Sequence, residues 1–309
     1  MSLYKTTKRR AVCLFARLCL WLFNRLPRAV TVCLGGWIGL VTWWFSPRAE
    51  HQALRHLELA ATGRFSFRTK QLIGREFYIN SGRNLADVVR MRRHFAAEID
   101  HLVEAEGMEH FDLAYRRGKG VIGITGHIGN FELLAAYIQK QGYDVAVIGR
   151  ELNNPGLNRL LVENRESVGL TNVYTTDSTK RMVDWLKKGG VVGVLIDIDS
   201  SRVRGLYLPV FGRWGYTPVG QTIIGLKCEA AFVPVVCLRQ PDHRYRVIAR
   251  PAIEPVTTGD FETDVRRMTG ACSRALEEII LAHPEQWPWQ HNRWRTPRPR
   301  HAEPLDIAL

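Results

Sequence analysis

The sequence predicts an α/β protein with a largely parallel central sheet flanked by helices, preceded by an N-terminal membrane-anchoring helical segment. Short apolar runs typical of buried strands alternate with longer segments of helical period between residues 107 and 282. This alternation favours parallel pairing, because a crossover helix is the usual connection between parallel strands. With 309 residues and 46% hydrophobic content, the chain is long enough for one large domain and an appendage.

The appendage is N-terminal. Residues 11–23 form an apolar run interrupted only by Arg17, and residues 29–45 form a second, uncharged run. As a helix the second run spans roughly 26 Å, slightly less than the hydrocarbon core of a bilayer. Its tryptophans and the flanking basic residues are typical of a membrane interface. We expect residues 1–48 to be an uncleaved membrane anchor, whether it spans the bilayer or lies in it; the alternatives are a secretory signal and a buried helical pair.

The rest of the chain divides into two further parts. Residues 49–108 are charged and helical in period, with interruptions expected at Gly63 and at the Ser81–Gly82 pair, and form a helical connecting region. Residues 109–309 form the α/β domain with a basic, tryptophan-rich tail, interpreted as a lid, a membrane-surface patch or a structural strap. The expected strands are residues 121–125, 145–148, 173–174, 191–196, 232–238 and 245–249. The expected helices are residues 131–140, 153–168, 179–188, 221–231 and 261–282, and residues 205–220 are a glycine-rich connection.

The net charge of +13 suits an anionic membrane, an acidic carrier protein, a phosphorylated substrate or nucleic acid. No helix-turn-helix, zinc finger or RNA-binding aromatic motif stands out, so we expect no nucleic-acid partner. The six cysteines include no CxxC pair, which indicates neither a disulfide framework nor a zinc site. We therefore expect no metal.

Three polar residues follow the carboxyl ends of separate predicted strands. They are His127, Arg150 and Asp197. Ligands of parallel sheets bind at that edge, so these positions predict one shared site.

His127 lies on a glycine-containing turn between a strand and a helix, five residues before Glu132. On one continuous helix the two side chains would point about 140° apart. If the helix begins between them, around Asn130, the histidine folds back towards the carboxylate. A carboxylate behind a histidine fixes the imidazole tautomer that a general base requires. The alternative is a turn histidine and a glutamate that only favours the helix dipole.

The sequence around His127 lacks the motifs of two classes of hydrolase. A serine hydrolase of the α/β type needs a GxSxG turn, which GITGHIGN at residues 123–130 does not contain. A zinc hydrolase prefers HExxH, whose two histidines share one helix face. The HxxxxE spacing of His127 and Glu132 does not place its two side chains in this way.

Several blocks of sequence resemble one family. HIGNFE at residues 127–132 is similar to the HxxxxD/E motif of glycerolipid-type acyltransferases, and the surrounding sequence resembles the bacterial lipid A biosynthesis (lauroyl/myristoyl) acyltransferases. The other similar blocks are GREL at 149–152 with Arg165 and Gly169 beyond it, LIDID at 195–199, LPVFG at 208–212, AFVPV at 231–235 and QWPWQHNRW at 286–294. The resemblance covers nearly the whole chain. Ile198 differs from the family pattern, which usually has a polar residue, often Gln, between the two aspartates. Because of this difference the resemblance does not identify the acceptor lipid.

The resemblance implies transfer of a fatty acyl chain to a hydroxyl of a lipid A precursor. The donor would be an acyl-carrier-protein or acyl-CoA thioester, the acceptor an anionic lipid, and no cofactor would be needed. The location implied is the cell inner membrane, with the catalytic domain on its cytoplasmic side. A different lipid acceptor (lysophospholipid, phosphatidylinositol mannoside or aminolipid) and a non-catalytic lipid-binding protein are the alternatives.

In that function His127 would deprotonate the acceptor hydroxyl and Glu132 would orient His127. Backbone N–H groups of residues 126–130, or Arg150, would stabilise the oxyanion. The residues expected to contact substrate are Arg150, Asn130, Arg165, Asp197 and Asp199. For Arg150 the alternative is a surface arginine, and for the two aspartates it is a role as turn formers.

Overall fold

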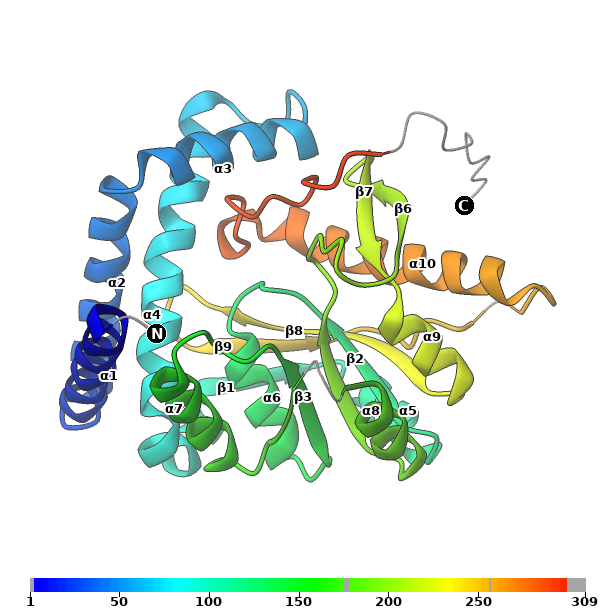
Figure 1. Cartoon of the computed structure of the whole chain (residues 1–309), viewed down its shortest axis with the longest axis horizontal. Coiled ribbons are helices and arrows are strands. Elements are labelled where there is room, and N and C mark those ends of the chain that lie inside the picture. Colours follow the sequence, from blue (N-terminus) through cyan, green and yellow to red (C-terminus); the bar gives the residue numbers. More distant parts are fainter. Residues whose placement is uncertain (1–2, 175–177, 256, 299–309) are drawn as a thin grey trace.

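A seven-stranded sheet forms the centre of the molecule (Figure 1). The structure is a computed structural model of the chain, and it describes residues 3–174, 178–255 and 257–298. The strand order is β1-β9-β8-β2-β5-β3-β4. The strands are β1 (Val103–Glu106), β2 (Val121–Thr125), β3 (Val145–Gly149), β4 (Thr171–Tyr174), β5 (Val191–Leu195), β8 (Ala231–Arg239) and β9 (Tyr245–Ala249). Within this seven-stranded sheet only β8 and β9 pair antiparallel, so the predicted largely parallel sheet is confirmed.

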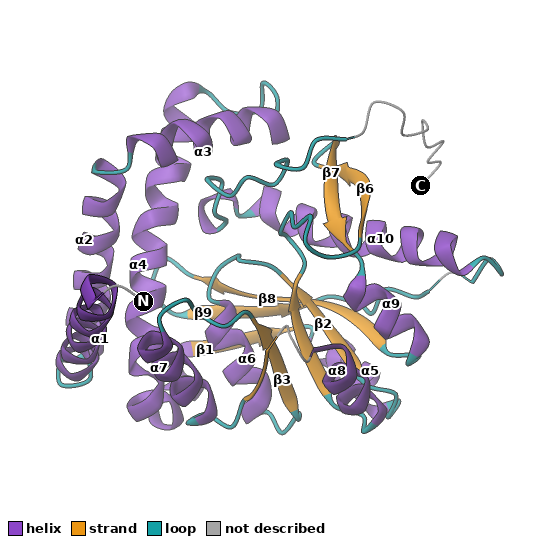
Figure 2. Cartoon of the chain, viewed as in Figure 1, coloured by secondary structure: helices purple, strands orange, loops and turns teal. Residues whose placement is uncertain are grey.

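Helices cover both faces of this sheet (Figure 2). They are α5 (Met108–Arg116), α6 (Phe131–Lys140), α7 (Pro155–Glu166), α8 (Ser178–Lys187), α9 (Gly220–Lys227) and α10 (Phe261–Ala282). Alternate residues of each central strand point to opposite faces. Val121 of β2 therefore packs in a cluster with α5 and α6, whereas Ile122 packs in a second cluster with α8, α9 and α10.

The predicted strands and helices of residues 121–282 are present within a few residues, and four elements of the α/β domain were not predicted. Strand β1 was missed because its alternation of apolar and charged residues extends over only four residues, of which one is buried. Helix α5 was also missed. The glycine-rich stretch forms an antiparallel hairpin of β6 (Gly205–Val210) and β7 (Arg213–Pro218). Phe211 and Gly212 at its turn both have positive φ, which is the geometry of a two-residue hairpin turn.

The N-terminal third is helical and packs beside the sheet. Its helices are α1 (Leu3–Phe23), α2 (Arg28–Trp44), α3 (Pro47–Ala60) and α4 (Phe67–Leu102). None of these described helices is both long and apolar enough to cross a membrane alone, although α2 and α3 meet that test jointly with an 88° bend between them.

The expected interruption at Ser81–Gly82 is wrong, because α4 continues through both residues. The glycine serves a close helix crossing instead. A Cβ on Gly82 would lie 2.0 Å from the carbonyl oxygen of Gly35 on α2. Only a residue without a side chain lets the two backbones approach so closely.

The chain ends in a strap that crosses the face carrying α10. We call residues 283–298 the C-terminal strap; it begins with a short 3-10 helix, η1 (Pro284–Gln286). Trp287 and Trp289 are each 1% exposed and pack on Phe211 of the hairpin. Residues 283–298 thus form a structural strap, one of the three interpretations of the tail, and the chain from Pro299 onwards lies outside the described residues.

Candidate active site

The predicted catalytic turn connects β2 to α6. Helix α6 begins at Phe131, and the side chain of Asn130 caps it by accepting a hydrogen bond from the N–H of Leu133 at 3.1 Å. The helix thus starts between His127 and Glu132, as predicted. Gly129 has a φ of +60°, and a Cβ there would lie 2.0 Å from the carbonyl oxygen of Cys237. The turn therefore requires glycine at this position.

His127 pairs with Asp197. The register of β2 and β5 places Thr125 opposite Leu195, so the residues two positions further along each strand meet at the edge of the sheet. Nδ1 of His127 lies 2.9 Å from one carboxylate oxygen of Asp197, and the backbone N–H of His127 donates to the other at 2.8 Å. A Cβ on Gly126 would stand 3.0 Å from the carboxylate carbon, so this glycine allows the close approach.

This pairing defines the state of the imidazole. A carboxylate only accepts hydrogen bonds, so Nδ1 carries the proton and Nε2 of the neutral ring is free to accept one. Burial lowers the pKa of His127, but the hydrogen bond and the charge of Asp197 outweigh it and raise that pKa above its ordinary value. Burial raises the pKa of Asp197, yet the bonds and charge of His127 and the bond from Trp287 bring it down to about 2. The carboxylate is thus ionised at neutral pH.

The C-terminal strap completes the surroundings of the histidine. The indole N–H of Trp287 donates to Asp197 at 2.8 Å, so the buried carboxylate accepts three hydrogen bonds. The ring of His291 lies 5.1 Å from that of His127, edge to face. Burial and the positive charge of His127 lower the pKa of His291. Sequence reasoning assigned no role to either strap residue, although both lie in the QWPWQHNRW block.

The predicted partnership of His127 with Glu132 is not formed. Glu132 instead accepts two hydrogen bonds from the guanidinium of Arg165, at 2.9 and 2.5 Å. The same guanidinium also donates to the side-chain oxygen of Asn172 at 2.6 Å. In the first turn of α6 the glutamate side chain points towards α7 and β4, where Arg165 lies. Glu132 is therefore held in an ion pair with Arg165, and Asp197 is the carboxylate that orients the histidine.

The other predicted contact residues have different surroundings. Arg150 is exposed just past β3 and has no ion pair with another described residue. Asn130 is 2% exposed and donates to the hydroxyl of Tyr245, so it holds the turn rather than facing solvent. Asp199 accepts from the backbone N–H and hydroxyl of Thr296, at 2.9 and 2.5 Å, and so fastens the strap.

The backbone amides expected to stabilise an oxyanion are largely engaged. The N–H of Gly129 donates to Gln286 at 3.0 Å and that of Asn130 to Cys237 at 2.8 Å. The N–H of His127 is held by Asp197. These bonds rigidify the turn and leave these three N–H groups without a free hydrogen for substrate.

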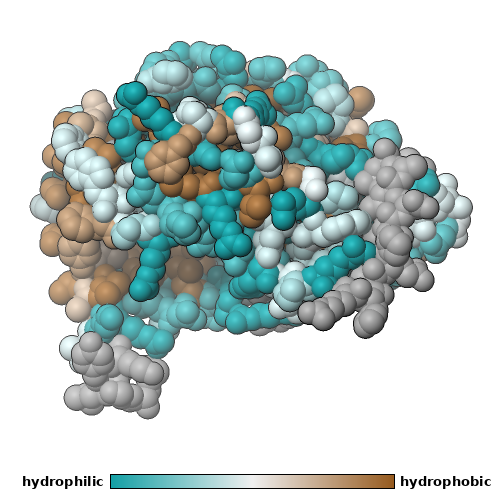
Figure 3. Space-filling model, turned by 90° about the horizontal axis from the view of Figure 1, so that it is seen from above, coloured by the Kyte–Doolittle hydropathy of each residue, from teal (hydrophilic) through white to brown (hydrophobic). Residues whose placement is uncertain are grey.

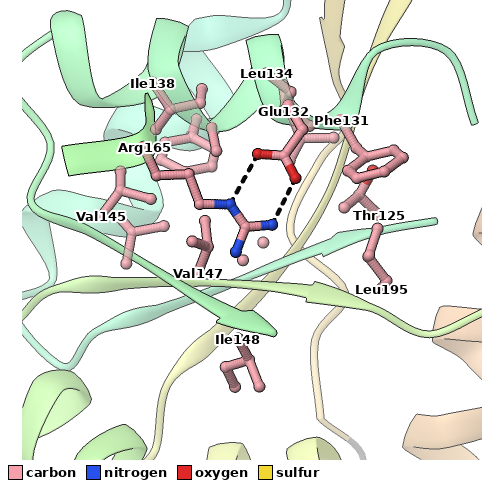
Figure 4. A pocket seen from close by; sticks show the side chains of 16 residues that line it. Thr125, Phe131, Glu132, Leu134, Ile138, Val145, Val147, Ile148, Arg165 and Leu195 are labelled. Atoms are coloured by element: carbon pink, nitrogen blue, oxygen red, sulfur yellow. Dashed lines mark hydrogen bonds and ion pairs between the residues drawn. The ribbon is translucent and has the colours of Figure 1, made fainter. Parts of the chain in front are cut away.

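An apolar cavity opens beside the turn, between α6 and the sheet (Figure 4). Phe131 links the two, because its ring lines the cavity and also lies 5.3 Å from the ring of His127. Gly123 and Gly193, opposite one another in β2 and β5, form part of the floor. Thr125 and the Glu132–Arg165 pair are the polar part of an otherwise apolar lining. The cavity is narrow, with a volume of about 60 Å³.

Comparison with known proteins gives consistent matches over this fold. A family model for bacterial lipid A biosynthesis acyltransferase matches residues 5–296. The chain is 26% identical over 279 residues to the lipid A biosynthesis lauroyltransferase of Escherichia coli K12, across 90% of this chain and 89% of that protein. It is 24% identical over 284 residues to the palmitoleoyltransferase of the same organism, with the same coverage. To the phosphatidylinositol mannoside acyltransferase of Mycolicibacterium smegmatis it is 22% identical over 191 residues, 60% of each chain.

Proposed function

Because this chain belongs to the bacterial lipid A biosynthesis acyltransferase family, we propose that it moves a fatty acyl chain from an acyl-carrier-protein thioester to a hydroxyl of a lipid A precursor, with His127 as general base. The protein is an O-acyltransferase, and its family transfers acyl groups to lipids. The donor, the particular acceptor and the residue roles are the proposed part. Acyl-CoA is the alternative donor.

The observation that carries the mechanism is the hydrogen bond between Nδ1 of His127 and Asp197. It leaves Nε2 as the basic nitrogen, on a side chain that is 29% exposed and so accessible to substrate. Asp197 fixes the tautomer and stabilises the imidazolium that forms when the base accepts a proton. We assign this orienting role to Asp197 and a positioning role to the Glu132–Arg165 pair at the cavity wall.

The reaction then needs no acyl-enzyme. Nε2 of His127 takes the proton of the acceptor hydroxyl while its oxygen attacks the thioester carbonyl carbon. The new C–O bond forms, and the tetrahedral oxyanion collapses with cleavage of the C–S bond. The imidazolium returns the proton to the departing thiolate, so the products are an ester and a free thiol.

The cavity beside His127 suits the acyl chain. Phe131 in its lining contacts the ring of His127, and apart from Thr125 and the Glu132–Arg165 pair its walls are aliphatic and aromatic (Figure 4). An acyl chain gains free energy as its methylenes leave water, about 0.8 kcal/mol each. Because the cavity is narrow, entry of a chain would displace side chains of α6, and the chain would extend across the glycines of the floor.

Gly193→Val should shorten the longest acyl chain that the enzyme transfers. A Cβ at Gly193 meets no atom nearer than 3.9 Å, and valine suits a strand, so the variant should fold. Its side chain would enter the cavity from the floor. We expect turnover of short-chain donors to persist while that of the longest wild-type donor falls about tenfold or more, from the steric cost of overpacking.

Competition between donors of different length, with products resolved by mass spectrometry, measures this change. Gly220→Val is the matched control, since a Cβ there meets nothing within 4 Å and the residue lies outside the cavity. An unaltered length preference in Gly193→Val would place the acyl chain elsewhere.

An apolar outer surface supports attachment to a membrane. Figure 3 shows hydrophobic side chains gathered over the end of the molecule that α1 and α2 form. Helix α2 buries its glycine-rich face against α4 and exposes the opposite face. The large exposed hydrophobic residues of this helix are Val30, Leu34, Trp37, Ile38, Val41 and Trp44. We propose that this surface inserts into the inner membrane from the cytoplasmic side.

Replacing Trp37 and Trp44 with glutamine should release the protein from membranes. The two side chains are 59% and 63% exposed and lie on one face of α2, seven residues apart. Losing both should weaken partitioning into anionic phospholipid vesicles at least about tenfold, from the apolar area no longer buried. Vesicle co-sedimentation measures it, and Leu113→Gln, which removes a 71% exposed apolar side chain from α5, should have no effect. If the double variant bound vesicles as well as the wild type, this face of α2 would not be the membrane-binding surface.

The proposed reaction is tested by incubating the purified full chain with acyl-carrier-protein and acyl-CoA thioesters and a lipid A precursor. Mass spectrometry should show the acceptor heavier by one acyl group. The similarity to a phosphatidylinositol mannoside acyltransferase favours one alternative acceptor class. Transfer to phosphatidylinositol mannoside, with the lipid A precursor unmodified, would support that alternative.

A further inference from the structure

A second cavity lies outside the catalytic turn, between α3 and the C-terminal strap. It has a volume of about 640 Å³, within the range of small-molecule sites. One wall is a single face of α3, and the other is the strap around Asn292 and Trp294. His56 joins the two walls, because its Nδ1 lies 2.7 Å from the carbonyl oxygen of Trp289 and its ring contacts Trp294. The cavity is therefore formed where the strap packs against α3.

Three arginines line this cavity without an acidic neighbour in its wall. Arg48 and Arg55 are seven residues apart on α3 and so share a helix face, and Arg295 comes from the strap. Arg48 and Arg55 have no ion pair with another residue in the described part of the chain, and Arg295 donates only to the backbone carbonyl of Asp199. Each guanidinium has five N–H donors, most of them here unused.

The charges of α3 are separated by face. Glu58 pairs with Lys70, and Glu50 accepts from Gln71, so both acidic residues of the helix are directed to α4. The basic residues face the cavity. A concave wall with several guanidinium groups and no carboxylate fits a compact anion with more than one charge, and the planar fork of arginine matches phosphate.

The walls of the cavity continue along the chain into the surroundings of His127 on one side and into the apolar surface on the other. Asn292 in its wall directly follows His291, whose ring lies 5.1 Å from that of His127. On the other side, Arg48 is the second residue of α3 and closely follows Trp44 and Phe45, which are 63% and 82% exposed. A lipid with its chains at the apolar surface would thus carry its headgroup to this cavity and present a hydroxyl towards His127.

We propose that the cavity between α3 and the strap binds a phosphate group of the lipid acceptor, with Arg48, Arg55 and Arg295 as its ligands. The identification of the occupant as the acceptor rests on the proposed function; binding of a phosphorylated lipid headgroup rests on the cavity alone. Bound in this way, the phosphate orients the acceptor so that one hydroxyl reaches Nε2 of His127.

The test compares Arg48→Gln/Arg55→Gln with Arg117→Gln/Arg213→Gln, in the full chain carrying His127→Ala so that no turnover occurs. Arg117 and Arg213 are exposed elsewhere, so both double variants lose the same charge. The probes are phosphatidylcholine vesicles with phosphatidic acid and the same vesicles with diacylglycerol. The apolar surface contributes equally to both, and their difference isolates the phosphate.

We expect the preference for phosphatidic acid to fall about tenfold or more in the cavity variant, from loss of charge-assisted hydrogen bonds, and to persist in the control. Inorganic phosphate should compete poorly, since it lacks the lipid. Equal loss in both variants would reduce the effect to net charge, and full competition by inorganic phosphate would indicate a free-phosphate site; either result overturns the proposal.

Kinetics with active enzyme separate this inference from the proposed reaction. In the cavity variant, KM for the lipid A precursor should rise while KM for the acyl-carrier-protein thioester is unchanged. A rise in the donor KM alone would assign the arginines to the carrier protein and overturn the inference, although acyl transfer stands. If no acceptor is acylated by the wild type, the proposed function fails, and the vesicle comparison still decides whether the cavity binds phosphate.

Discussion

His127→Ala should lower kcat by about 10²- to 10⁴-fold, the usual contribution of a positioned general base. The variant lacks the nitrogen that removes the hydroxyl proton, but the cavity and the apolar surface are built from other residues. Lipid binding should therefore persist. Steady-state kinetics of acyl transfer, with vesicle binding measured in parallel, separates the two effects.

The control for this variant is His101→Ala. His101 is exposed at the end of α4, away from the sheet edge that carries the site. Its replacement should leave kcat within about twofold, as surface substitutions usually have small effects. Wild-type turnover by His127→Ala would rule out the mechanism proposed here.

Asp197→Asn should lower kcat by a similar factor of about 10² to 10⁴ for a different reason. The asparagine oxygen can still accept from the indole of Trp287 and the backbone of His127, which turns its NH₂ group towards Nδ1. That group donates, so Nδ1 becomes the acceptor and the proton moves to Nε2. The ring is then held in the tautomer that cannot take a proton from the substrate.

The same variant should shift the pH dependence of the residual activity. Asp197 raises the pKa of His127 against the effect of burial, so its loss lowers that pKa. A base works when unprotonated, and the acidic limb of the kcat profile should therefore move to lower pH. Asp199→Asn, two residues away, alters a carboxylate that holds the strap, so the limb should stay in place. An unmoved limb in Asp197→Asn would contradict the pairing.

The low pKa of Asp197 also has a consequence for stability. Its folded value of about 2 lies below the ordinary 3.8, so the ionised carboxylate stabilises the fold above about pH 4. This contribution is lost as the pH falls from about 4 to 2.

Local sequence determined much of the fold. The apolar runs of residues 121–125 and 191–195 could be recognised as buried strands because nearly every residue is apolar, and Asn130 marked a helix start by its capping chemistry. The hairpin at residues 205–218 was not predicted, because its glycines and prolines are also typical of a loop and its pairing depends on a turn at Phe211 and Gly212. Gly82 resembled a helix break because its partner Gly35 is distant in sequence.

The sequence by itself placed His127, Arg150 and Asp197 at the carboxyl ends of strands, since strand polarity and crossover rules are local. It could not tell which strands are neighbours or in what register they pair. Only the tertiary structure puts Thr125 opposite Leu195, and through that register joins His127 to Asp197 and leaves Glu132 to Arg165. Five residues of separation suggested the nearer carboxylate, but distance along the chain does not decide contact. The carboxylate that orients the histidine is 70 residues away in sequence, and the pairing of β2 with β5 and the docking of the strap bring it into contact.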